Sequence, residues 1–111
     1  MCVVNAVMTV CTDATIYGPN ATSVDVKLKP GIGTEGWNRT YMMNLQYLSG
    51  GKWLAVGSHS GSFKYGATVQ YPLSGKQAGT YRLVIDYKLY DGSGAYKQSD
   101  TLHHPDFAVR R

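Results

Sequence analysis

The sequence has few charged residues and no long apolar run, and each shortage excludes a class of protein. Asp, Glu, Lys and Arg make up 16% of the 111 residues, well below the roughly 25% of an average soluble domain. Such a low share disfavours a long solvated helix or a disordered, highly charged tail. No apolar stretch approaches the roughly 20 residues that a membrane-spanning helix needs, so we predict no transmembrane segment.

Catalytic motifs are also lacking. The sequence contains no serine-hydrolase elbow, phosphate-binding loop or zinc-protease helix, and it has only three histidines. The one group with ligand chemistry is His103, His104 and Asp106. Adjacent residues of a strand point to opposite faces, so the two imidazoles are poorly placed to bind one ion. We therefore predict a protein that is not an enzyme, with no catalytic residues, no metal and no cofactor.

The basic residues are scattered. The formal net charge is +4, yet the only run of basic residues is the pair Arg110–Arg111 at the end of the sequence. Nucleic-acid binding normally requires a clustered basic patch, so we expect no nucleic-acid partner. A mildly basic surface still favours anionic polymers such as cell-wall glycans.

Only two cysteines are present, Cys2 and Cys11. A straight strand would separate them by roughly 30 Å, so they pair only if the chain folds back between them. Three readings remain open: a buried Cys11 with a frayed Cys2, an intrachain disulfide, or a lipid-bearing Cys2. Because Met1 directly precedes Cys2, we interpret the start as a chain whose signal peptide has been removed. We accordingly expect a secreted or cell-surface protein.

What the sequence does contain is repeated period-two alternation of apolar and polar residues, with turn residues between the runs. The strongest run is Tyr81 to Leu89, and weaker ones include 3–10 and the polar stretch 96–102. Both faces of 40–48 carry apolar residues, so this strand is expected to be central. The stretch 58–66 is polar and glycine-rich and is interrupted only by Phe63 and Tyr65. About seven short strands predict an all-β, two-sheet antiparallel sandwich formed by one domain over 1–111.

The segment from Tyr41 to Gly94 resembles the second half of a fibronectin type III or similar immunoglobulin-like domain. Three features carry the resemblance: the hairpin 47–53, the strand 69–73 followed by a glycine turn and Gly79-Thr80-Tyr81, and the turn 91–94. The resemblance implies that Tyr81 is a corner tyrosine whose hydroxyl bonds to backbone just upstream. The Ser-Gly-Gly-Lys-Trp and Gly-Thr-Tyr-Arg stretches are similar to those of small secreted sandwich proteins of Gram-positive bacteria.

Aromatic residues near turns are the candidate ligand-binding residues. Trp37 lies in the loop 30–40, Trp53 follows a glycine hairpin, and Tyr90 and Tyr96 flank the turn 91–94. Aromatic rings stack on sugars and peptide ligands and are frequent binding anchors. The alternative for each is packing against the domain's own core. Asn20-Ala21-Thr22 and Asn38-Arg39-Thr40 also fit the acceptor pattern for N-glycosylation.

Three functions fit these observations. The first is a secreted, non-catalytic binding or adhesion module that contacts a protein or a cell-surface glycan. The second is a secreted toxin, antimicrobial or protease-inhibitor protein that acts on a cell envelope or an enzyme. The third is a structural subunit that assembles through exposed strand edges, for which we expect the strands 3–10 and 96–102 to be the edges.

Overall fold

A computed structural model describes all residues 1–111, and every regular element in it is a β-strand. The strands are β1 (Cys2–Val4), β2 (Met8–Thr12), β3 (Ile16–Tyr17), β4 (Ser23–Pro30), β5 (Asn38–Ser49), β6 (Lys52–Phe63), β7 (Ala67–Pro72), β8 (Gly79–Tyr90), β9 (Tyr96–His103) and β10 (Phe107–Val109). No helix of the length and hydrophobicity needed to cross a bilayer is present.

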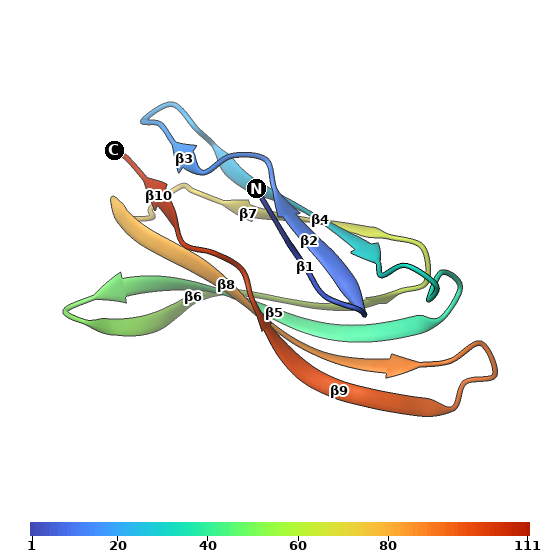
Figure 1. Ribbon diagram of the computed structural model, residues 1–111. Helices are drawn as coiled ribbons and strands as arrows, with labels where there is room; N and C mark the ends of the chain where they lie inside the picture. Colours follow the sequence, from blue (N-terminus) through green and yellow to red (C-terminus); the bar gives the residue numbers. More distant parts are fainter.

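The strands form two sheets that lie face to face (Figure 1). The smaller sheet has the order β1-β2-β4-β7. In the larger sheet β6, β5 and β8 are neighbours, and β9 and β10 both pair with the far side of β8, at its two ends. The predicted all-β, two-sheet sandwich is confirmed. Every pairing is antiparallel except the short parallel contact of β3 with β10.

The predicted strand 3–10 is two strands, because Asn5 breaks it. The Asn5 Oδ1 accepts hydrogen bonds from the backbone N–H groups of Val7 at 2.8 Å and Met8 at 2.9 Å. This Asx-type turn competes with strand pairing and reverses the chain. The Asn5 Nδ2 also donates a hydrogen bond to the Tyr87 hydroxyl at 3.1 Å, which attaches the turn to the larger sheet.

The polar, glycine-rich stretch 58–66 is strand for most of its length, because β6 continues to Phe63 and pairs with β5 throughout. Apolar alternation is not visible in this part of β6 because two of its inward-facing positions are glycines. A Cβ at Gly57 would lie 3.0 Å from the Tyr71 ring, and one at Gly61 would lie 2.8 Å from the Tyr41 hydroxyl. Glycine lets these aromatic rings approach the strand closely, so the buried volume comes from β5 and β7 and not from β6.

The core consists of the inward side chains of both sheets. On β5, Tyr41, Met43 and Leu45 are buried, while Met42 points out and is 49% exposed. As expected, β5 is central, between β6 and β8. The Tyr71 hydroxyl of the smaller sheet donates to the Met43 carbonyl of the larger one at 2.8 Å, which joins the sheets by a buried hydrogen bond.

The corner tyrosine is confirmed: the Tyr81 hydroxyl donates to the Gln77 carbonyl at 2.6 Å. Its ring lies against Tyr47, with 5.0 Å between ring centroids. This bond fixes the loop that enters β8 and supports the immunoglobulin-like strand arrangement that the resemblance implied.

Arg39 is a buried cation that sequence reasoning missed. It continues the inward period of β5 and has no exposed surface. Its Nη2 donates to the Thr34 carbonyl at 2.8 Å and to the Thr34 hydroxyl at 2.9 Å, and its guanidinium lies 5.1 Å from the Phe63 ring centroid. Arg39 therefore anchors the loop between β4 and β5 to the interior, where apolar surroundings strengthen its hydrogen bonds.

We predict that Gly31→Ala destabilises the domain. The Gly31 N–H donates to the Val7 carbonyl at 2.9 Å, and an added Cβ would overlap the Ala6 carbonyl oxygen. Because backbone sits on both sides of this contact, relief requires separating the loop from the first hairpin. We expect a loss of about 2 kcal/mol of unfolding free energy in thermal or urea unfolding.

Gly92→Ala is the matched control, because nothing lies within 4 Å of its Cβ position and its φ is not positive. We expect a change within about 0.5 kcal/mol. Equal stabilities of the two variants would contradict the proposed steric contact.

Cys2 and Cys11 are directly opposite each other on β1 and β2 and are joined by a disulfide, with 4.0 Å between their Cα atoms. The Asn5 turn supplies the fold-back that pairing required.

We predict that replacing both cysteines by serine costs roughly 2–3 kcal/mol of unfolding free energy, since the disulfide restricts a short loop in the unfolded chain. Urea unfolding with and without reductant measures this. Free thiols in the native protein would contradict the pairing.

Candidate functional site

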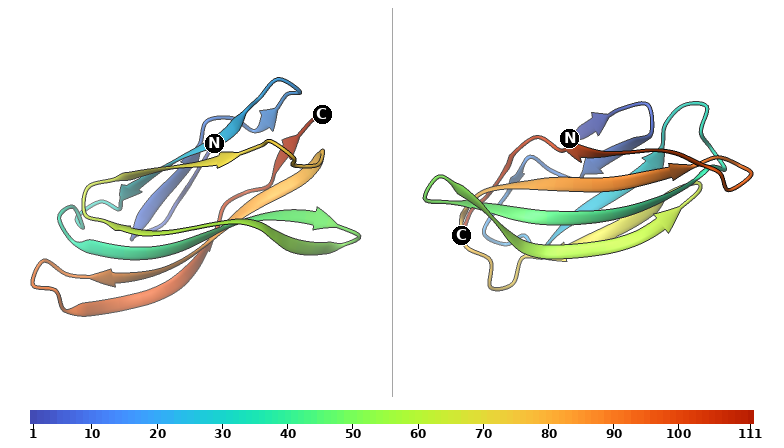
Figure 2. Two further views of the ribbon diagram at one scale, coloured as in Figure 1. Left: turned by 180° about the vertical axis from the view of Figure 1, so that it is seen from behind. Right: turned by 90° about the horizontal axis from the view of Figure 1, so that it is seen from below.

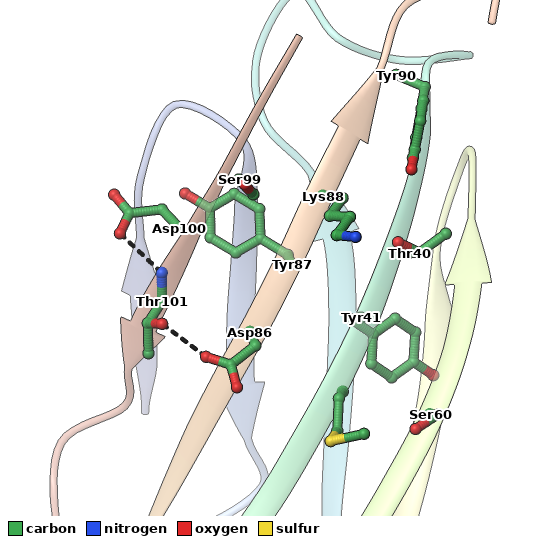
Figure 3. A pocket seen from close by; sticks show the side chains of 11 residues that line it. Thr40, Tyr41, Ser60, Asp86, Tyr87, Lys88, Tyr90, Ser99, Asp100 and Thr101 are labelled. Carbon is green, nitrogen blue, oxygen red and sulfur yellow. Dashed lines mark hydrogen bonds between the residues drawn. The ribbon is translucent and has the colours of Figure 1, made fainter. Parts of the chain in front are cut away.

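The outer face of the larger sheet, meaning the side that points away from the smaller sheet, carries an open groove of about 640 Å³ that crosses β6, β5, β8 and β9 (Figure 3). We call it the outer-face groove. Its lining residues are Thr40, Tyr41, Met42, Ser60, Asp86, Tyr87, Lys88, Tyr90, Ser99, Asp100 and Thr101.

Strand register explains why these residues meet. With Tyr41 and Met43 inside, period-two geometry turns Met42 outward. The register places Ser60, Asp86 and Thr101 in one row with Met42 across the four strands. The next row contains Thr40, Lys88 and Ser99. Residues from four separate parts of the sequence thus form one surface.

The groove is mainly polar and offers both donors and acceptors. The Asp86 carboxylate accepts a hydrogen bond from the Thr101 hydroxyl at 2.6 Å, and the Asp100 carboxylate accepts one from the Thr101 backbone N–H at 2.8 Å. Lys88 adds an ammonium group, and the half-exposed Met42 adds an apolar area. By register Asp100 is opposite the inward-facing Tyr87, so the charged side chains on the outer face are Asp86 and Lys88. Their charges balance, and the groove has no net positive charge to attract a polyanion.

An aromatic pair lies at one end of this groove. Tyr90 lines it, and Tyr96 lies beside Tyr90 in an edge-to-face arrangement with 5.9 Å between ring centroids. Tyr96 is 57% exposed, and its hydroxyl is 2.7 Å from the Ser99 hydroxyl. These two predicted residues are therefore brought together, and they present a ring surface next to the polar rows.

The other two predicted aromatics lie elsewhere. Trp53 is on the same face but at the β5–β6 hairpin, where the Arg82 guanidinium lies 4.2 Å from its ring centroid. Arg82 is held there by a 2.7 Å hydrogen bond from its Nε to Gln46. Trp37 is half-buried and packs against the hydrophobic core, which is the alternative to ligand binding given for it above.

His103 and His104 point to opposite sides of the chain, as strand geometry indicated: His103 is exposed and His104 is buried. The His104 ring nitrogens lie 2.8 Å from the Pro105 carbonyl and 3.1 Å from the Met1 carbonyl. The imidazole therefore connects the junction of β9 and β10 to the N-terminal strand.

Comparison with known families gives one match. Residues 4–110 match the YqgA MG2 macroglobulin domain. The chain belongs to this macroglobulin domain family. No curated protein matches the sequence. The macroglobulin domain is a non-catalytic, immunoglobulin-like sandwich, which agrees with the two sheets and the corner tyrosine described above.

Sequence reasoning missed most of the macroglobulin domain's groove. Asp86, Lys88, Ser99 and Thr101 are ordinary polar residues on the solvent side of alternating strands. Alternation assigns each to an outer face, but only the pairing of β8 with β5 and β9 makes them neighbours. No motif in a single stretch of sequence could reveal that juxtaposition.

The turn that presents the tyrosine pair is held by Asp91. Its Oδ1 accepts hydrogen bonds from the Ser93 N–H at 2.9 Å, the Ser93 hydroxyl at 2.6 Å and the Ala95 N–H at 3.0 Å. Lys97 lies 3.6 Å from Oδ2. These contacts, chiefly the Ser93 side chain and the Ala95 and Ser93 backbone, lower the pKa of Asp91 to about 2.

We predict that this carboxylate makes folding stability pH-dependent. A pKa lowered in the folded state stabilises the domain above the unfolded-state pKa, and this contribution is lost as the pH falls towards 2. Asp91→Asn removes the charge, so the stability difference between wild type and variant should shrink between about pH 4 and pH 2. Urea unfolding at several pH values measures it. A constant difference over this range would contradict the assignment.

Proposed function

We propose that this macroglobulin domain is an extracellular, non-catalytic binding module that holds a neutral saccharide chain in the outer-face groove. The observation that carries the proposal is the combination of polar rows centred on Asp86 and Lys88 with the exposed ring of Tyr96 at one end. Sugar rings offer hydroxyls to carboxylate and ammonium groups and a C–H face to aromatic rings, and this groove supplies partners for both.

The charge of the groove supports a neutral ligand over an anionic one. Asp86 and Lys88 are the charged side chains on its outer face, and their charges balance. The scattered basic residues of the chain therefore do not converge here, and a polyanion would find no net positive charge. A neutral glycan can use both groups as hydrogen-bonding partners.

Binding without catalysis fits the contents of the groove. Its lining includes no histidine or cysteine. The Asp86 carboxylate accepts a hydrogen bond from the Thr101 hydroxyl, and the groove is open to solvent. Catalysis would require a nucleophile, a base and an orienting group in mutual reach inside a site that excludes water.

The disulfide supports an extracellular location. Cys2 and Cys11 are bonded, and such bonds persist in oxidising compartments and are rare in the cytosol. A secreted domain would also be in the compartment where cell-surface glycans are found. The toxin and inhibitor alternatives gain no comparable observation from the structure.

The proposal is tested by titration calorimetry with neutral hexasaccharides of glucose, N-acetylglucosamine, xylose and mannose. We predict that at least one binds, and that Tyr96→Ala weakens it about tenfold, or about 1.4 kcal/mol, because the ring surface at the groove end is lost.

Tyr65→Ala is the control, since Tyr65 is an even more exposed tyrosine, at 74%, in the loop between β6 and β7 and outside the groove. Unfolding curves should show both variants folded. Either the absence of binding by all four sugars or an equal loss in both variants would refute the assignment.

A further inference from the structure

The strand β6 leaves a long edge of the larger sheet without a partner. It pairs only with β5 and is the outermost strand of that sheet (Figure 2, right). Of its residues Lys52–Phe63, only Phe63 is buried. One row of its backbone N–H and C=O groups therefore faces outward, ready to pair with another strand.

The other edges of this domain are short or charged. The strand β1 is three residues long and β3 is two. The strand β7 ends at Pro72, and β9 carries Lys97 and Asp100. By contrast, β6 has no charged residue and no proline between Lys52 and Lys64. Soluble proteins usually protect a long edge with charges, prolines or a covering element, so the unprotected β6 indicates an edge that is used.

We infer that β6 pairs with β6 of a second copy of this chain, antiparallel and centred on Ser60. The regular part of the edge is Gly57–Phe63, because an irregularity in the β5–β6 pairing occurs before Gly57. Pairing about Ser60 places Ser60 opposite its copy, His59 opposite Gly61, and Ser58 opposite Ser62. The two larger sheets then form one continuous sheet.

Side-chain size and charge favour this arrangement. Each imidazole meets a glycine across the interface, so His59 keeps its stacking position beside Tyr41, with 6.3 Å between ring centroids. The remaining facing residues are serines, which are small and carry hydroxyl hydrogen-bonding groups. No like charges face each other, although both partners carry the same sequence. A register centred on His59 would instead place the two imidazoles directly opposite each other.

The interface is limited to one strand pair, so the dimer should be weak. Sedimentation velocity of the wild-type chain should show a rising mass as the concentration increases from about 10 µM to about 1 mM. Ser60→Lys should abolish this rise, because it sets two ammonium groups against each other. Ser99→Lys on β9 is the control and should dimerise like wild type. A wild-type monomer over the whole range would overturn the inference.

Cysteine trapping tests the register. Directly opposed residues of antiparallel strands lie within disulfide reach, so Ser60→Cys should give a covalent dimer under mild oxidation, and Ser99→Cys should not. A stronger crosslink from His59→Cys than from Ser60→Cys would overturn the Ser60-centred register. Calorimetry of sugar binding and sedimentation of the free protein are separate measurements, so failure of dimerisation and failure of sugar binding are distinguishable outcomes.

Discussion

The pairing of β5 with β8, from Asn38–Tyr90 to Tyr47–Tyr81, is the interaction on which the rest of the structure depends. This ladder puts Met43 beside Ile85 on the inside and Met42 beside Asp86 on the outside. A slip by one residue would exchange these faces, bury a carboxylate and expose the core. The same register therefore determines both the hydrophobic interior and the polar rows of the outer-face groove.

Local sequence predicts the strands well where one face is buried and the other is exposed to solvent. The run from Tyr81 to Leu89 shows this alternation clearly, and the turn 91–94 follows from local chemistry. The corner tyrosine was instead implied by the resemblance to an immunoglobulin-like domain. The prediction fails where a tertiary contact overrides the pattern. Asn5 interrupts an apolar run by accepting hydrogen bonds from two backbone N–H groups. The strand β6 lacks apolar alternation because neighbouring aromatic rings occupy the space that its own side chains would fill.

The candidate site was predictable only in part, for a related reason. Tyr90 and Tyr96 are separated by one turn, so their proximity follows from the sequence. The rows that contain Ser60, Met42, Asp86 and Thr101 need three strand pairings at once. Arg39 is a further case, since nothing local distinguishes a buried, hydrogen-bonded arginine from a solvated one. Its burial depends on Thr34 and Phe63, which other segments bring to it.

The disulfide between Cys2 and Cys11 also determines how the domain transmits tension. A pull applied through residue 1 passes from Cys2 across the sulfur bridge to Cys11 and bypasses the turn at Asn5. The first hairpin therefore cannot be peeled open one hydrogen bond at a time. The load reaches β2 at Cys11, where β2 pairs with Lys27 of β4. Reduction of the Cys2–Cys11 disulfide would let the segment before Cys11 extend before the load reached β2.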